Sequence, residues 1–240
     1  MDKWEVTGTE TTEGIDGVSG ATISLEKTAY ILGAVWTCYS LWHWVNGGAR
    51  EIIRNITGDN YSIVELRTFL NDKNSAYQLF ALEQLDRVKD DDPKTVSLLI
   101  DALERAPGLL KPSLVYLEAA PAPLFHNAIE HLIGSHRKDF RLGGLKAIID
   151  TNHKLPSTFY QNLVSGVSNF QSYEEVDALL LILDNKNAYS SDMSSPFLSL
   201  LEGENFLIGR TVYWFLSDKY LTTQQQEMMK VFYSRFKHKM

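Results

Sequence analysis

The fold of this chain is decided by a recurring type of segment, of which residues 95–103, TVSLLIDAL, are the clearest example. Apolar residues in this segment are spaced three and four positions apart, so they fall on one side of an α-helix. Four other segments share the pattern: VELRTFL at 64–70, FHNAIEHLI at 125–133, FYQNLVSGV at 159–167 and FLSLL at 197–201. The chain from residue 62 onward is therefore predicted to be helical.

A second helix follows each of these segments at a nearly constant interval. The second helices are predicted to begin near Asn74, Gly108, Asp139, Ser172 and Asn205, at separations of 34, 31, 33 and 33 residues. A period of about 33 residues suits two helices and two turns. Proline is favoured in the first turn of a helix, where its missing N–H would have no partner. Four of the first helices have a proline at or near their start: Pro93, Pro121, Pro156 and Pro196.

A final helix, predicted from Thr222 to about Lys237, closes the series with a polar outer face. No segment alternates apolar and polar residues long enough to predict a sheet in this region. The predicted fold class is all-α: an α-solenoid of about five helical hairpins over residues 62–240, in which neighbours bury one another's apolar faces. In period and pattern the repeats resemble HEAT-like helical-hairpin repeats. The resemblance implies a curved surface for binding or scaffolding and leaves the partner open.

Composition and charge narrow the possible functions. The chain has 240 residues, 44% of them hydrophobic, which is enough for a sizeable core without disulfides or metals. Its net charge is −7 and its 23 basic residues are scattered, so nucleic acid is not an expected partner. Cys38 is the only cysteine, which excludes a disulfide framework. Its apolar neighbours in the sequence predict a buried thiol.

Residues 28–46 contain no Asp, Glu, Lys or Arg and are rich in aliphatic residues and tryptophan. This composition predicts a helix that is buried on most sides. The helix is not expected to span a membrane, because Thr37, Ser40 and His43 form a polar stripe and its mean hydropathy is modest. The glycines at 47–48 are expected to end it, with glycine in the left-handed conformation of a C-cap.

The motif that carries chemistry is DGVSGAT, residues 16–22. A Ser-Gly-Ala-Thr turn that leads into a helix exposes the Thr22 hydroxyl beside helix N-terminal amides, which favour an anionic phosphate. Gly20 lets the backbone approach a ligand closely, and Ala21 adds no bulk. Asp16 is placed to orient a hydroxyl, to bind a metal during group transfer, or to close the turn. The turn from Ser19 to Thr22 is therefore a candidate phosphate site.

This motif resembles the flavinylation motif of the FMN-binding domain family, which reads Asp, two variable residues, Ser or Thr, Gly, Ala, then Thr or Ser. All five specified positions are met, by Asp16, Ser19, Gly20, Ala21 and Thr22. In that family a flavin transferase uses FAD and magnesium to join FMN, through its phosphate, to the final hydroxyl, here that of Thr22. The resemblance thus implies covalent FMN as the cofactor.

The resemblance also suggests a division of the chain. Residues 1–48 are expected to be a short remnant, the last part of an α+β FMN-binding domain, with the motif and the long apolar helix. Residues 49–61, which carry an amphipathic pattern of isoleucines, are expected to connect it to the HEAT-like helical repeat domain at 62–240. Most of the family's sheet precedes the motif, whereas 15 residues precede Asp16. Without that sheet, Trp36, Trp42 and Trp44 are expected to be exposed unless the repeats cover them.

Three functional hypotheses follow. The first is an electron-transfer flavoprotein, or a piece of one, with FMN on Thr22 and the helical repeats docking it against a redox partner. The second is a flavin-free interaction or scaffold module, and the third is noncovalent binding of a phosphorylated ligand at the turn. By resemblance the first places the protein outside the cytoplasm, in a bacterial periplasm or in association with a membrane, after loss of a leader. A true start at Met1 would instead keep it in the cytoplasm.

No catalytic constellation is evident in the sequence, which contains no GxSxG, HExxH or P-loop motif. His126, His131 and His136 are five residues apart and turn about 140° from one to the next on a helix, so they do not share a face that could bind a metal. They are expected at the surface or in turns. The aspartates at 90–92 precede Pro93 and are expected to cap a helix rather than to bind calcium.

Overall fold

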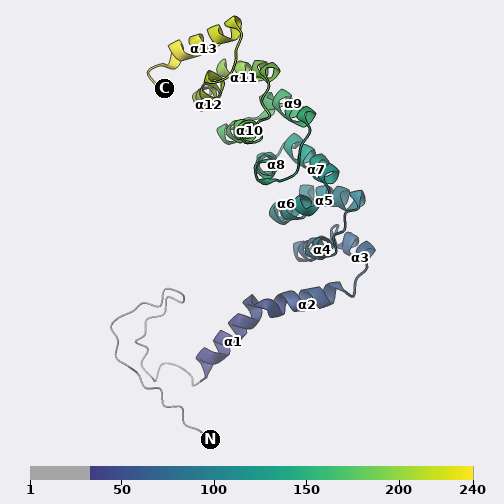
Figure 1. Ribbon diagram of the computed structural model, residues 1–240. Coiled ribbons are helices and arrows are strands. Elements are labelled where there is room, and N and C mark those ends of the chain that lie inside the picture. The colour runs from purple at the N-terminus through teal and green to yellow at the C-terminus, as the bar shows by residue number, and fades with distance from the viewer. Residues whose placement is uncertain (1–32, 240) are drawn as a thin grey trace, which may run out of the picture. The chain divides into compact units, whose positions relative to one another are not determined.

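The computed structural model describes residues 33–239, and over these residues the chain is all-α. Within that range it has thirteen α-helices, three short 3₁₀ helices and no strand. The described chain falls into two units, with the boundary between Asn60 and Tyr61, and Figure 1 labels the helices of each.

The larger unit is a series of helix pairs followed by one more helix. The first helices of the pairs are α3 (Ile63–Phe69), α5 (Pro93–Arg105), α7 (Ala122–Gly134), α9 (Ser157–Ser165) and α11 (Ser194–Leu201). The second helices are α4 (Ser75–Arg87), α6 (Leu110–Ala119), α8 (Lys138–Asp150), α10 (Tyr173–Asn185) and α12 (Phe206–Ser217). The last helix is α13 (Thr223–Phe236), and the 3₁₀ helices are η1 (Pro107–Leu109), η2 (Val167–Asn169) and η3 (Ser191–Met193).

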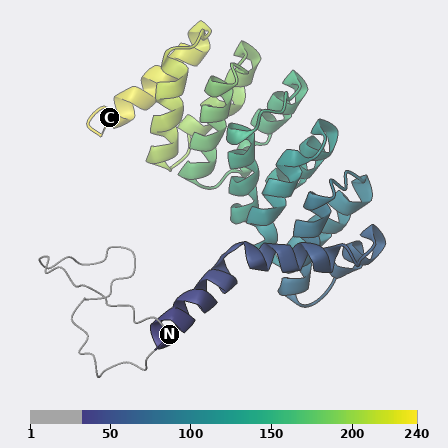
Figure 2. The ribbon, with the colours of Figure 1, turned by 60° about the horizontal axis from the view of Figure 1, so that its bottom comes forward.

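First and second helices form two layers, as Figures 1 and 2 show. Consecutive second helices pack on one another from α4 to α12, and in the other layer α11 packs against both α9 and α13. Each second helix begins within two residues of the position predicted from the repeat period. The predicted all-α class and the series of sequential helix pairs are therefore confirmed.

Helix starts are fixed by the residues that the sequence places there. Asn74 and Asn205 are N-caps whose side-chain oxygens accept backbone N–H groups at the starts of α4 and α12. Pro93 occupies the first position of α5, as predicted. Thr222 and Gln225 form a capping box at the start of α13.

The core runs continuously through the stack because each hairpin buries its apolar residues against its neighbours. Phe125, Phe140 and Phe197 are among the fully buried side chains. Glycines permit the closest helix approaches. A Cβ on Gly144 would lie 2.9 Å from Ile133 Cγ1, and one on Gly209 would lie 2.5 Å from Phe232 Cε2.

Polar contacts at a sequence separation of about one repeat tie the ends of successive second helices together. Thr151 Oγ1 donates to Glu118 Oε1 at 3.0 Å, and its carbonyl accepts from Lys186 Nζ at 2.7 Å. Lys219 Nζ contacts Asp184 Oδ1 at 2.8 Å one repeat further on. These contacts fix which residues of adjacent hairpins face each other.

The first two hairpins share a partly buried ion pair, in which Asp90 is buried and Arg67 half-buried. Arg67 on α3 donates to Asp90 at 2.8 Å, and Thr95 donates to the same carboxylate at 2.6 Å. The Tyr116 hydroxyl on α6 donates to the Asp90 carbonyl, and burial raises the pKa of this phenol. Asp92 caps α5 as predicted, but Asp90 does not, since its side chain lies in the core between hairpins.

A second, buried ion pair joins α8 to α10. Arg141 Nε donates to Glu175, while Arg141 Nη1 donates to the carbonyls of Ser135 and His136 at 3.0 and 2.9 Å. The other carboxylate oxygen of Glu175 accepts from the Ser172 N–H and hydroxyl at 2.9 and 2.8 Å. Glu175 is 0% and Arg141 6% exposed, so two charges are removed from water and fully engaged with each other and with the backbone.

The smaller unit contributes two described helices, α1 (Ala34–Asn46) and α2 (Gly48–Gly58). No residue of α1 is buried. The prediction of a helix buried on most sides is therefore wrong for residues 34–46, because apolar composition alone does not supply a covering layer. The buried thiol predicted for Cys38 is wrong for the same reason, since this side chain is exposed.

The end of α1 lies where the sequence predicts it, but its conformation differs. Gly47 is the C-cap and its N–H donates to the His43 carbonyl at 2.7 Å. Its φ of −92° and ψ of −174° are extended rather than left-handed, because α2 begins at the next residue and the chain continues directly into it. The left-handed glycine is Gly33, with φ of +88°, at the other end of the helix.

Two adjacent glutamates on α10 allow a matched test of the buried pair. Glu175→Ala is expected to destabilise the chain by about 3–5 kcal/mol, because it leaves the Arg141 charge buried without its partner. Glu174→Ala should have a much smaller effect, since Glu174 pairs with Lys138 at the surface. Urea denaturation of both variants measures the difference, and equal losses would contradict the assigned role of Glu175.

The Arg141–Glu175 ion pair predicts that the free energy of unfolding depends on pH. Burial raises the pKa of Glu175, but hydrogen bonds from Arg141 and from the Ser172 hydroxyl and N–H outweigh it, leaving the pKa below its ordinary value. A carboxyl group whose pKa is lower in the folded chain than in the unfolded chain stabilises the fold at pH values above its unfolded pKa. This stabilisation is lost as the pH falls through the folded-state pKa. The gap in unfolding free energy between wild type and Glu175→Gln should therefore be present at about pH 7 and shrink as the medium is taken below about pH 4. A gap that widens on acidification would exclude this account.

Candidate binding site

The residues of the flavinylation-like motif lie outside the part of the chain that the structure describes. Asp16, Ser19, Gly20, Ala21 and Thr22 all precede residue 33. The described chain begins at Gly33, the N-cap of α1. The predicted phosphate turn and its flavin thus stay predictions, and the site with described geometry is elsewhere.

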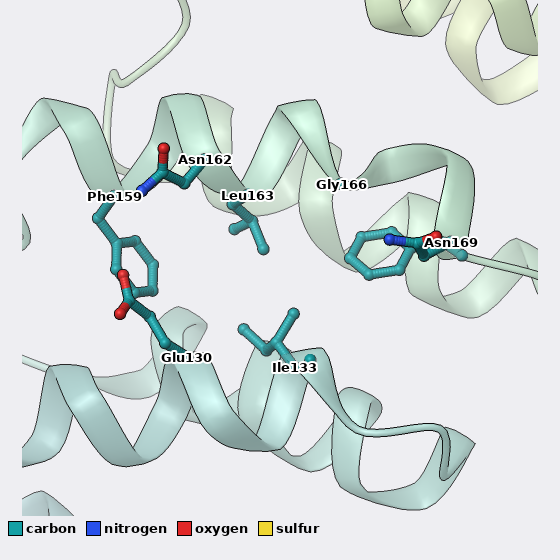
Figure 3. A pocket seen from close by; sticks show the side chains of 9 residues that line it. Glu130, Ile133, Phe159, Asn162, Leu163, Gly166 and Asn169 are labelled. Atoms are coloured by element: carbon teal, nitrogen blue, oxygen red, sulfur yellow. The ribbon is translucent and has the colours of Figure 1, made fainter.

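That site is a pocket of about 280 Å³ between α7 and α9, two consecutive first helices. Figure 3 shows Ile133 of α7 facing Leu163 of α9 across it, with Phe159 at one end and Asn169 of η2 at the other. Phe159, Leu163 and Phe170 are buried and form an apolar floor. An apolar floor of this size suits one medium or large hydrophobic side chain.

The rim of the α7–α9 pocket is polar and exposed. Glu130 of α7 lies beside Phe159, and Asn162 extends from the next turn of α9 (Figure 3). Asn169 supplies a second amide from η2. Amides both donate and accept hydrogen bonds, and the carboxylate accepts them or pairs with a cation. This arrangement can hold an apolar group while its polar neighbours bond to the rim, and it contains no nucleophile paired with a base.

Local backbone geometry explains why the pocket exists. The segment FYQNLVSGV is helical as predicted, but α9 ends at Ser165 with Gly166 as its C-cap, and η2 follows. Gly166 N–H donates to the Asn162 carbonyl and Asn169 N–H to the Gly166 carbonyl, at 3.1 and 2.9 Å. The tighter turn places Asn169 and Phe170 at the end of the groove. Sequence reasoning missed this site, although Gly166 inside the apolar pattern was a signal for an early helix end.

The histidines flank this region without forming a metal site. His126 on α7 is half-buried, with its ring 6.2 Å from that of Phe159. Burial lowers the pKa of His126, and the neighbouring His153 lowers it further, so the imidazole is neutral at pH 7. His131 and His136 are exposed, as predicted. No group of three or more His, Cys, Asp or Glu side chains within residues 33–239 is arranged to hold a metal.

Two further grooves lie on the larger unit. One, of about 420 Å³, lies between α11 and α13 and has Leu201 and Phe232 in its floor. The other lies between the second helices α4 and α6 and is lined mainly by apolar groups, including Leu79, Pro112 and Val115.

The most exposed apolar surface belongs to the smaller unit. Trp36, Trp42 and Trp44 of α1 are 74%, 60% and 70% exposed. On α2 the isoleucines at 52, 53 and 56 share one side of the helix and are equally open to solvent. Exposed apolar surface of this kind marks a place where another surface normally packs.

No helix in the described part of the chain has the length and apolar character needed to cross a bilayer. Comparison of the chain with protein-family models, curated proteins and solved structures finds no match.

The exposure of α1 can be checked by substitution. Trp42→Ala is expected to change the unfolding free energy by about 0.5 kcal/mol or less, because the ring makes no buried contact. Phe125→Ala, which removes a fully buried ring, should cost about 3–5 kcal/mol and serves as the comparison. Denaturant unfolding gives both values. A loss of similar size for Trp42→Ala would mean that α1 is covered in solution.

Proposed function

We propose that the chain is part of an electron-transfer flavoprotein in which FMN is attached to Thr22 and the helical hairpins form an α-solenoid of the HEAT-like type that docks the flavin against a protein redox partner. The observation that carries the proposal is DGVSGAT, in which Asp16, Ser19, Gly20, Ala21 and Thr22 meet every specified position of the flavinylation motif. In this reading residues 1–48 are the last part of the flavin domain.

The surface of α1 supports this reading. In the resembled family a long apolar helix follows the motif and packs on the domain's sheet. Here too an apolar helix follows the motif. It has an exposed tryptophan near its start, Trp36, and two near its end, Trp42 and Trp44. An exposed apolar helix of this kind is a surface on which another layer normally packs.

Attachment of FMN to Thr22 is the transfer of the FMN part of FAD to a hydroxyl group, with AMP as the leaving group. The Thr22 hydroxyl oxygen bonds to the phosphorus on the FMN side of the FAD pyrophosphate, that pyrophosphate bond breaks, and AMP leaves with the electron pair. The hydroxyl proton passes to the medium. When bound, FMN supplies the electron-carrying chemistry, and this chain supplies its position and its contact with a partner. Because the reaction needs a flavin transferase and FAD, it is tested by co-expression.

The test is covalent flavin retained after denaturation. The chain, co-expressed with a flavin transferase and supplied with FAD, is expected to keep absorbance near 450 nm, about the flavin value, in the precipitated protein. Thr22→Ala should lose it, because no phosphoester can form. Thr22→Ser should keep it, since the motif accepts either hydroxyl, and Ser24→Ala is the matched control two residues away.

The outcomes separate the hypotheses. Flavin that persists in Thr22→Ala would place the attachment elsewhere. A second flavin-accepting protein, expressed in the same cells, shows that the transferase is active. If that protein is modified and the wild-type pellet of this chain is colourless, the result favours a flavin-free interaction module. The exposed grooves of the helical array also suit such a module. A phosphorylated ligand that binds reversibly and survives Thr22→Ala would favour a noncovalent phosphate site at the Ser19–Thr22 turn.

A further inference from the structure

Apolar residues recur along α1 and α2, the two helices of the smaller unit, at intervals that alternate between three and four. On α1 they are Val35, Cys38, Trp42 and Val45, and on α2 they are Ala49, Ile52 and Ile56. These are the a and d positions of a heptad repeat that keeps one register across the break between the helices, for about three heptads. We call this set of residues the heptad stripe.

The heptad stripe is open to solvent at every position. Its five large aliphatic and aromatic side chains are each at least 60% exposed. The helix α1 has 13 residues, none of them buried, and its N-cap Gly33 supplies no side-chain hydrogen bond. A helix of this length is marginal in water unless its apolar face is packed. The stripe therefore calls for a covering surface.

The charges of the two helices lie away from the heptad stripe. The helix α1 has no Asp, Glu, Lys or Arg, and on α2 Arg50, Glu51 and Arg54 occupy b, c and f, the outer positions of the heptad. The e and g positions, which flank the stripe and select a partner by charge, hold uncharged residues from Tyr39 to Asn55. A second copy of the chain therefore meets no like charge along the stripe.

We infer that copies of this chain associate with one another through the heptad stripe, each copy laying its a and d side chains against those of the next. A lipid surface fits less well, because interfacial helices are rich in Lys and Arg on their polar face. Here α1 has neither residue, and Glu51 lies between the two arginines of α2.

Association through the stripe leaves the opposite side of α1 available. Trp36 and Trp44 occupy the outer positions b and c, so they stay open to another layer when the stripe is covered. The inference thus goes beyond the proposed function without competing with it, and it requires no flavin.

The first test is the mass of the full chain, expressed without flavin transferase and measured by sedimentation equilibrium over a series of concentrations. The wild type is expected to reach at least twice its monomer mass of 27.2 kDa. Trp42→Lys and Ile52→Lys should each return it to the monomer mass, because a lysine in the stripe would be taken out of water.

Two outer positions provide matched controls for these variants. Trp44→Lys, two residues from Trp42 on α1, and Thr57→Lys, on the same helix as Ile52, should keep the wild-type mass. All four side chains are exposed, so the variants should also keep the wild-type circular dichroism.

The thiol of Cys38 reports directly on whether the stripe is covered, because it is the only cysteine and belongs to the stripe. A water-soluble maleimide should label it at least about tenfold more slowly in the associated wild type than in Trp42→Lys, since a second copy blocks access to the thiol. Ser40→Cys in a Cys38→Ser background places the thiol at outer position f, where labelling should be equally fast with and without Trp42→Lys.

Association also makes stability depend on protein concentration. At dilutions that give the monomer mass, Trp42 has no buried contact, and the small effect expected for Trp42→Ala applies there. As the concentration rises, the unfolding midpoint of the wild type should increase, and that of Trp42→Ala should increase less.

Three results would overturn the inference: a wild type of 27.2 kDa at every concentration, an association that Trp42→Lys and Trp44→Lys weaken equally, or Cys38 labelling that association does not slow. Binding to vesicles of phosphatidylcholine and phosphatidylglycerol that both tryptophan variants reduce alike would assign the helix to a lipid surface instead. Because the chain is tested without flavin, failure here leaves attachment at Thr22 standing, and a colourless pellet leaves the heptad stripe standing.

Discussion

The larger unit depends on burial between neighbouring hairpins. A single helical hairpin of this length cannot enclose its own apolar face, so residues such as Phe125 and Phe140 become buried only when the adjacent hairpins are in place. Apolar burial is not directional, and it would tolerate several alignments of one hairpin on the next. The partly buried pair Arg67–Asp90 and the buried pair Arg141–Glu175 sit at such junctions, and each favours the alignment in which its two charges meet. Hydrophobic contact thus supplies cohesion, and these ion pairs supply register.

The repeat architecture could be predicted from sequence because its signals are local. The apolar spacing, the prolines before first helices and caps such as Asn74 and Asn205 each act within a few residues, and the observed helices follow them. Asp90 could not be predicted from local signals. Its position next to Asp92 predicts another capping residue, but contacts from Arg67 and Tyr116, which are distant in the sequence, place it in the core.

The candidate sites were less predictable for two different physical reasons. The exposure of α1 depends on what packs against it, and an apolar helix has the same composition whether it is covered or not. The α7–α9 pocket depends on the replacement of a final α-helical turn by η2, a small change in hydrogen bonding that moves Asn169 and Phe170 to the end of the groove. The motif that ends at Thr22 was conspicuous in the sequence, yet it precedes the described residues.

The contacts between second helices also determine how the stack would respond to mechanical load. Thr151 contacts Glu118 and Lys186 across 33 and 35 residues, and Lys219 contacts Asp184 across 35. Contacts of this span join each hairpin to its immediate neighbours, so under a pulling force the terminal hairpins, which have one neighbour, are held less firmly than the inner ones, which have two. Extension would proceed by release of single hairpins, in increments of about 33 residues, from the ends inward.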